Sequence, residues 1–410
     1  MIKYSELCKN GENLHPMTSF ERNILKKIEN KLWVFILMAA FAAGCYVRFM
    51  LRSNVSEDMY TYLLNWYTDI KNAGGLPALS EQVGNYNVLY QFIIAIFTYL
   101  PIPPVFAYKA LSIAFDLLLA GITGLYLFDR EEKRDCLLGT LGFSLIWLSP
   151  VVSLNSSMWG QCDSIYTFFV IAALFSLEKE RFNKAFILLG IAFAFKLQAI
   201  FILPFFIYRY LSERKFSIVR FLYIPAIMWI STIPAIIAGR GIFTGFRLYF
   251  SQTGEYGALT MNSPGFVSLI ACDYQVLHYD ELAPIFILLT AVIVGSLIFY
   301  ALVKKFELKD SSYWSFALLL TYTCVFFLPA MHERYGYIYE IIAIIYCFKN
   351  KKAIVPCALL QLISMCTYGY YLMQGTVSLK SLVLLNILVY IMYVCLFFKE
   401  EKAFRGGEDE

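Results

Sequence analysis

The chain has 410 residues, of which 59% are hydrophobic, 18% aromatic and 16% charged. A water-soluble domain could not bury that much apolar surface, since soluble proteins average about a quarter charged residues. The net charge of +4 is small and the basic residues stand in connections between apolar runs. This distribution indicates membrane orientation and argues against nucleic acid as a partner.

Apolar runs follow one another along most of the sequence. A bilayer core about 30 Å thick takes roughly 20 apolar residues per helical crossing, so this length holds about ten to twelve crossings. Each run should be helical, because backbone groups in lipid must pair internally. We therefore expect an all-α polytopic membrane protein, with a transmembrane region at 32–398 between a cytoplasmic lead-in, 1–31, and a cytoplasmic tail, 399–410. The runs lie near 32–51, 88–100, 105–128, 136–152, 160–177, 184–208, 218–239, 282–303, 313–330, 335–348, 353–373 and 379–398.

Basic residues orient the C-terminal half of the chain. Three clusters of Lys and Arg predict cytoplasmic connections. Counting crossings between them places the loop 240–281 and the segment around His332 on the external face, and a cytoplasmic N-terminus places the loop 52–87 there too. The clusters are Arg209, Arg214, Lys215 and Arg220, then Lys304, Lys305 and Lys309, then Lys349, Lys351 and Lys352.

The stretch between the first loop and the first basic cluster admits two topologies. If each run crossed once, the basic connections 129–135 and 178–184 would lie outside. We favour the alternative, in which 88–100 is re-entrant and 184–208 is two short helices broken near Lys196. That choice places both basic connections inside.

The first external loop contains a candidate general base. Apolar residues at helical spacing between Tyr60 and Tyr67 predict an amphipathic helix on the membrane surface, ended by Gly74 and Gly75. Asp58 stands at the start of this helix. A carboxylate at the membrane boundary can take a proton from an attacking hydroxyl, although Asp is also favoured as a helix N-cap.

A second polar feature interrupts two late apolar runs. His332, Glu333 and Arg334 are followed by Tyr335, and ionisable groups at a membrane boundary are costly and usually functional. Arg334 could hold a phosphate through two hydrogen bonds, with His332 donating a third. Together they would neutralise a phosphate as it leaves. The other interpretation is an interfacial loop with a Glu333–Arg334 pair.

A third polar feature combines two strings. Trp159, Gln161 and Asp163 fall where an apolar helix would otherwise continue, and Lys196 and Gln198 follow one hairpin later. The acid and the lysine could pair as structural glue or could form part of a binding site. Trp159 offers a flat face for a sugar or lipid, or serves as an interfacial anchor.

No cofactor is expected. The sequence has no Walker A loop, no dinucleotide fingerprint and no nucleotide-sugar domain, and its ten cysteines are scattered singly. Asp58, Asp163 and Glu333 could in principle meet around a divalent ion, but their spacing does not indicate a metal site.

These strings resemble the GT-C-fold glycosyltransferases, and among them the bacterial relatives of the second mannosyltransferase of GPI-anchor assembly. The resemblance covers about 58–335, and its last string also looks like the His-Glu-Lys type motif of the N-glycan-pathway glucosyltransferases. Family members usually carry Asn-Tyr-Pro-Pro-Leu-Tyr and Lys-Pro-Gln, so this chain departs at prolines that affect local backbone shape rather than polar groups. After the first-loop acid, the strings are Asn85-Tyr86-Asn87-Val88-Leu89-Tyr90, Trp159-Gly160-Gln161-Cys162-Asp163-Ser164, Lys196-Leu197-Gln198-Ala199 and His332-Glu333-Arg334-Tyr335.

The resemblance implies a multi-pass enzyme of the cell membrane that moves a hexose, mannose or glucose, from a polyprenyl-phosphate sugar to an extracytoplasmic glycan or lipid-linked acceptor. Such enzymes invert the anomeric centre and act on the external face. Asp58 would be the general base, and His332 with Arg334 would contact the carrier phosphate. The further site candidates are Asn85, Tyr86, Trp159, Gln161, Asp163, Lys196, Gln198, Glu333 and Tyr335.

Other functions remain open at this point. A transporter or flippase of lipid-linked sugars would spread polar residues through several mid-membrane positions and show repeat symmetry, whereas here they cluster at one face. A polysaccharide polymerase would carry a large arginine-rich loop, whereas 240–281 has only Arg240 and Arg247. A noncatalytic scaffold would leave the polar clusters without a purpose.

Overall fold

The structure is a computed structural model that describes residues 17–129, 135–252, 257–271, 274–375 and 377–406. The first sixteen residues of the expected lead-in and the last four of the tail lie outside this part. Helices dominate the described chain, and its one sheet pairs β1 (Thr260–Met261) in parallel with β2 (Met331–His332). The expectation of an all-α polytopic membrane protein is confirmed.

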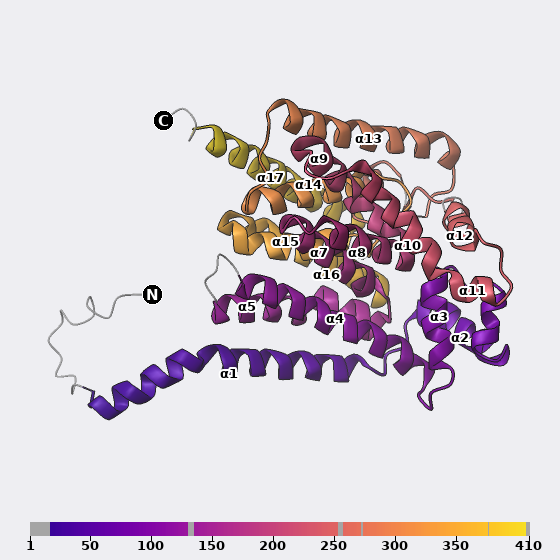
Figure 1. Ribbon diagram of the computed structural model, residues 1–410, viewed down its shortest axis with the longest axis horizontal. Helices are drawn as coiled ribbons and strands as arrows, with labels where there is room; N and C mark the ends of the chain where they lie inside the picture. Colours follow the sequence, from indigo (N-terminus) through magenta and orange to yellow (C-terminus); the bar gives the residue numbers. More distant parts are fainter. Residues whose placement is uncertain (1–16, 130–134, 253–256, 272–273, 376, 407–410) are drawn as a thin grey trace.

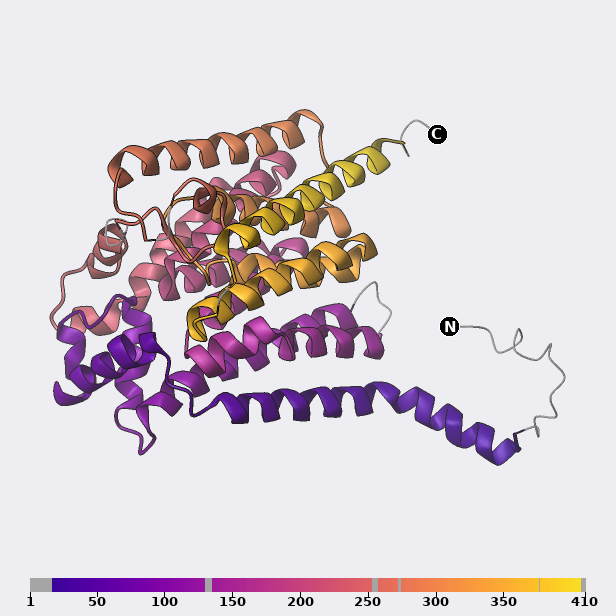
Figure 2. The same ribbon diagram turned by 180° about the vertical axis from the view of Figure 1, so that it is seen from behind.

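Most of the long helices lie side by side along the long axis of the molecule (Figures 1 and 2). They form one bundle with an aromatic-rich core. In chain order they are α1 (Ser19–Leu51), α4 (Pro104–Phe128), α5 (Cys136–Trp147), α7 (Asp163–Glu178), α8 (Phe182–Phe195), α9 (Leu203–Glu213), α10 (Tyr223–Ser231), α13 (Tyr279–Val303), α14 (Ser311–Phe327), α15 (Tyr337–Lys349), α16 (Ile354–Leu372) and α17 (Leu379–Gly406).

Short elements connect these helices, and α2, α3, α11 and α12 gather at one end of the bundle (Figure 1). The short helices are α2 (Leu64–Asn72), α3 (Val88–Phe97), α6 (Pro150–Ser153), α11 (Ile233–Ile237) and α12 (Thr244–Gln252). The π-helical turns are η2 (Met59–Leu63) and η5 (Leu154–Trp159). The 3-10 turns are η3 (Leu76–Ser80), η6 (Leu197–Ile202), η7 (Ile218–Leu222), η8 (Phe266–Leu269) and η9 (Lys351–Ala353).

Within the described ranges, five helices are long and apolar enough to cross a membrane, or six if one bent pair is a single span. That pair, Cys136–Trp147 with Pro150–Trp159, bends by 47°. The expected ten to twelve crossings also counted shorter apolar runs, four of which form helices of 10–17 residues. The five long spans are Lys31–Leu51, Pro104–Phe128, Tyr279–Val303, Lys351–Leu372 and Leu379–Glu401.

The basic connections share the end of the bundle opposite to α2 and α3, where α1 begins and α17 ends (Figures 1 and 2). Ion pairs join these connections to one another, so their proximity does not depend on the view. The pairs are Lys179 with Asp129 at 3.1 Å, Lys349 with Asp310 at 2.8 Å, and Lys215 with Glu180.

Two of the expected apolar runs, 88–100 and 184–208, do not form single long helices. The ten residues of α3 rise only about 15 Å, half of a bilayer core, and α3 lies beside α2 (Figure 1). The run 184–208 breaks at Lys196, which is extended with φ −153° and ψ 134° between α8 and η6. The predicted break near Lys196 is confirmed, and the re-entrant path of 88–100 stays a prediction.

The first-loop helix forms where it was expected, and part of its apolar face packs against the protein. η2 and α2 run from Met59 to Asn72, and Gly74 and Gly75 follow with positive φ. Tyr67 is buried and its ring meets that of Tyr108 on α4 at 6.4 Å. Tyr60 of the same predicted face is 70% exposed. The position of this helix on the membrane surface therefore stays a prediction.

A buried ion pair joins the first helix to the rest of the bundle. Arg48 on α1 donates to Asp116 on α4 at 2.9 Å, and its guanidinium lies 3.5 Å from the ring centroid of Trp147. Ser156 on η5 donates to the same carboxylate oxygen at 2.6 Å. A charge in this position must be paired, because the desolvation cost would otherwise be uncompensated.

We predict that Asp116→Ala strongly destabilises the protein, since it leaves the Arg48 guanidinium buried without its partner. The loss should be about 3–5 kcal/mol in the free energy of unfolding, measured by thermal unfolding in detergent. Asp129→Ala is the matched control, because its pair with Lys179 is exposed and worth about 1 kcal/mol or less. Equal stability losses in the two variants would contradict the assigned role of the buried pair.

Candidate active site

Asp58 lies at the junction between the first loop and η2, but it does not cap that helix. Its backbone is helical and its side chain makes no capping hydrogen bond. The carboxylate instead accepts hydrogen bonds from Trp159 Nε1 and Gln161 Nε2, both to Oδ2 at 2.9 Å, and from the Tyr371 hydroxyl to Oδ1 at 2.8 Å. The helix-cap interpretation is therefore wrong. Three side-chain donors orient the Asp58 carboxylate instead.

A glycine between the two Oδ2 donors makes this arrangement possible. η5 ends at Gly160, whose φ of 82° is the left-handed conformation that favours glycine. A Cβ at this position would lie 2.3 Å from the terminal methyl of Met59, so a larger residue would also require that side chain to move. The turn lets Trp159 and Gln161 reach one carboxylate although they are only two residues apart.

Arg334 occupies the centre of the polar cluster. Its guanidinium lies 3.2 Å from the carboxylate of Glu333, 3.7 Å from Asp58 and 4.0 Å from Asp163. Burial alone would lower the pKa of Arg334, but Glu333 and Asp58 outweigh it and raise the pKa well above its usual value. The three acids that could have met around a divalent ion thus meet around an arginine.

Asp163 has a second cation of its own. Lys196 Nζ lies 2.5 Å from Oδ1, and the side-chain amide of Asn155 donates to Oδ2 at 3.0 Å. The break at Lys196 positions this amine, because the extended residue leaves the path of α8. The sequence left open whether Asp163 and Lys196 pair with each other or belong to a binding site. The structure shows the pair. Lys196 also lines a cavity.

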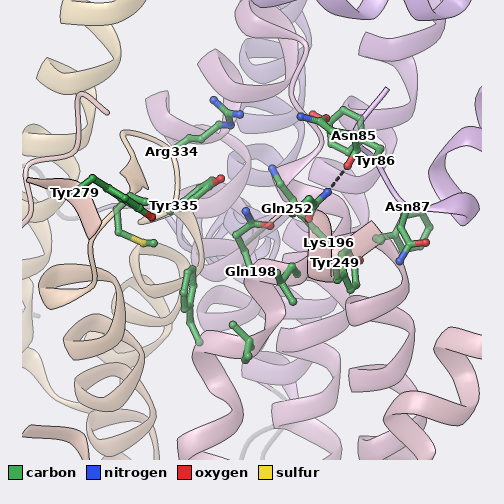
Figure 3. A pocket seen from close by; sticks show the side chains of 16 residues that line it. Asn85, Tyr86, Asn87, Lys196, Gln198, Tyr249, Gln252, Tyr279, Arg334 and Tyr335 are labelled. Carbon is green, nitrogen blue, oxygen red and sulfur yellow. Dashed lines mark hydrogen bonds between the residues drawn. The ribbon is translucent and has the colours of Figure 1, made fainter. Parts of the chain in front are cut away.

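Two cavities meet at this cluster. The large cavity has a volume of about 790 Å³ and the small one about 220 Å³. Asn85, Tyr86 and Arg334 line both, so these side chains form the partition between them. Figure 3 shows the small cavity, with Arg334 and Tyr335 on one side of Lys196 and Gln198, and Asn85 and Tyr86 on the other.

The charged groups are divided unequally between the cavities. Asp58, Glu333 and His332 line the large cavity. Lys196 and Arg334 line the small cavity, and no Asp or Glu is among the described residues of its wall. Arg334 therefore presents a cation to both spaces, while the carboxylates face only the large one.

All the predicted site residues lie at this cluster or on its cavities. Tyr86 donates to Gln161 at 3.0 Å, and Gln252 of α12 donates to the Asn85 carbonyl. Tyr371 and Asn155 are site residues that were not predicted from the sequence. Tyr371 is 313 residues from Asp58 and stands in an apolar run without a recognisable motif, so no local signal marks it.

A family model described as Mannosyltransferase (PIG-M) matches residues 156–263. This match supports a glycosyltransferase. It fits a GT-C-like enzyme related to the GPI mannosyltransferases. The matched model is that of PIG-M, whereas the sequence motifs resemble relatives of the second GPI mannosyltransferase. No curated protein matches the chain.

The matched span covers only part of the site. It includes Trp159, Gln161, Asp163 and Lys196, and it ends within the loop beside β1. Asp58 and the motif His332-Glu333-Arg334-Tyr335 lie outside it. The structure brings these matched and unmatched parts together at one cluster.

We predict that Lys196→Met destabilises the protein by about 3–5 kcal/mol, because the buried Asp163 carboxylate loses its closest cation. Asp163→Asn introduced into the same variant should restore most of the lost stability. Thermal unfolding of the two single variants and the double variant in detergent completes the cycle. Additive losses in the double variant would show that the pair is not coupled.

Proposed function

We infer that the protein transfers a hexose, mannose by the family match, from a polyprenyl-phosphate sugar to a glycan or lipid-linked acceptor with inversion at the anomeric carbon. The observation that carries this proposal is the division of charge at Arg334. A base faces one cavity, and cations without carboxylates face the adjoining one. A transfer that needs a base on one reactant and an anion site for the other fits this division.

Asp58 is the proposed general base. Oδ2 accepts two hydrogen bonds and lies near Arg334, whereas Oδ1 accepts only the bond from Tyr371 among the described residues. A carboxylate oxygen has two acceptor positions, so Oδ1 keeps one for the hydroxyl of the acceptor. As the hydroxyl oxygen attacks the anomeric carbon, its proton passes to Asp58 and the bond from that carbon to the phosphate oxygen breaks.

The small cavity is the proposed site of the donor phosphate. The leaving polyprenyl phosphate gains one negative charge, and the cations that line this cavity, Lys196 and Arg334, stabilise that charge. Apolar side chains of η6 form another part of the wall, and Ile200 among them is 43% exposed. An isoprenoid chain can leave the site past this residue into lipid.

His332 lies on the other side of the partition, in the large cavity. Its ring is 5.2 Å from that of Tyr335, and Nδ1 is 3.8 Å from Glu333. In the proposed reaction Arg334 contacts the phosphate directly, and His332 faces the acceptor side of the partition.

The expected sidedness is also part of the proposal. The site lies at the end of the bundle that carries α2 and α3, whereas the basic connections lie at the other end (Figure 1). By the positive-inside rule, this supports cytoplasmic termini and an extracytoplasmic site.

We predict that Asp58→Asn reduces sugar transfer by about 10²–10⁴-fold, because the amide cannot accept the proton of the attacking hydroxyl. The measurement is transfer of labelled sugar from a panel of synthetic polyprenyl-phosphate sugars by purified protein. The fold should be retained, since Arg334 keeps the carboxylates of Glu333 and Asp163 in this variant, and thermal unfolding checks this.

Glu57→Gln is the matched control for this experiment. Glu57 is the neighbouring acid, and its exposed side chain contacts Thr61 rather than either cavity. Full activity of Asp58→Asn would rule out the assigned base. If the wild type consumes no donor while labelled lipid crosses a proteoliposome membrane, the transporter hypothesis replaces the transferase.

We predict that transfer persists in excess EDTA. The three carboxylates nearest to one another surround Arg334, and its positive charge takes the position that a divalent ion would need. The activity of EDTA-treated protein should equal that of untreated protein at the same ionic strength. Loss of activity that only a divalent ion restores would contradict this assignment.

A further inference from the structure

Two aromatic side chains extend from the proposed base along one face of its helix. Asp58, Tyr62 and Trp66 recur at every fourth position of η2 and α2, and all three line the large cavity. The rings of Tyr62 and Trp66 lie 5.8 Å apart, tilted by 40°. Because i and i+4 positions share a helix face, the base and the rings form a single row.

The row is separate from the face that packs against the bundle. Tyr67 is 3% exposed and contacts Tyr108, whereas Tyr62 is 51% exposed. Large aromatic side chains that stay open on a cavity wall have surface to offer a ligand.

Trp66 is held in place by the loop that follows α2. Gly84, with φ +71°, lies so close to the indole that a Cβ there would be 2.5 Å from the ring. The Tyr86 ring meets the indole edge-on at 5.8 Å, and Gln82 donates to the carbonyls of Gly84 and Tyr86 at 2.9 Å each. The ring is therefore preorganised, which reduces the entropy cost of binding against it.

A sugar ring is the ligand that matches this row. One face of a pyranose is made of C–H groups, which pack on a flat aromatic ring, while its hydroxyls need polar partners at the edge. Asn85 and Gln161 line the same cavity and supply amide groups. Eight helical positions from Asp58 to Trp66 span roughly 12 Å, which is longer than one sugar ring.

We propose that Tyr62 and Trp66 form an acceptor subsite for a glycan of at least two sugar units. The terminal sugar lies against Tyr62 with its hydroxyl at Asp58, and the next sugar stacks on Trp66. This inference rests on the proposed transferase function and adds the class of acceptor.

The test compares acceptors of one, two and three sugar units with wild type and Trp66→Leu. In the variant the KM for acceptors of two or more units should rise roughly tenfold, while the KM for the monosaccharide stays unchanged. Trp66→Tyr should restore most of the loss because it keeps a ring. Tyr60→Leu is the matched control, since Tyr60 is on the same helix, is 70% exposed and does not line either cavity.

A second variant acts on Trp66 without removing it. Gly84→Ala should displace the indole and raise the KM for the longer acceptors in the same way. A KM that rises equally for every acceptor length, or that rises in Tyr60→Leu as well, would overturn the subsite. Transfer by the wild type to simple lipid alcohols but to no glycan would overturn it and leave the transferase function intact, whereas no consumption of any donor would overturn both.

Discussion

The guanidinium of Arg334 is the point on which the site depends. It lies within 4.0 Å of carboxylates from the first loop, from the start of α7 and from its own turn before α15. A buried cation requires such compensation, and each acid requires the cation in return. Lys196 then balances the acid of α7, which accounts for the break between α8 and α9. Removing this charge would therefore loosen several elements at once.

The same residue separates two chemical environments within a small distance. On one side are the proposed base and the aromatic rings of Tyr62 and Trp66, and on the other are a lysine and apolar side chains of η6. A reaction between a polar, hydroxyl-bearing acceptor and a lipid phosphate needs such a contrast. The first-loop helix contributes twice, because its inner face packs against α4 while its row of Asp58, Tyr62 and Trp66 faces the cavity.

The sequence predicts the parts of this site that are out of place in an apolar chain. Asp58 and Arg334 are conspicuous for that reason, and the cost of burying a charge is a property of each residue by itself. Tyr371 is not conspicuous, since tyrosine is common in this chain, and only the packing of α16 brings it to the base. The packing of Tyr67 against Tyr108 also escaped prediction, because lipid and a protein core select the same apolar pattern. The position of Arg334 among the three acids could not be predicted, because the spacing of residues along the sequence does not give distances between helices.

The hydrogen bond from Tyr371 to Asp58 has a consequence for biogenesis. It joins residues 313 positions apart, so the hydrogen bonding of the proposed base is complete only after the helix α16 has been made and inserted. At about 5–20 residues per second, the ribosome needs roughly 15–60 s to make that length of chain. During this interval the nascent protein already displays its first loop but lacks a finished site. The proposed base is thus fully hydrogen-bonded only when nearly all of the polypeptide has been inserted, and a prematurely terminated product would lack the Tyr371 contact.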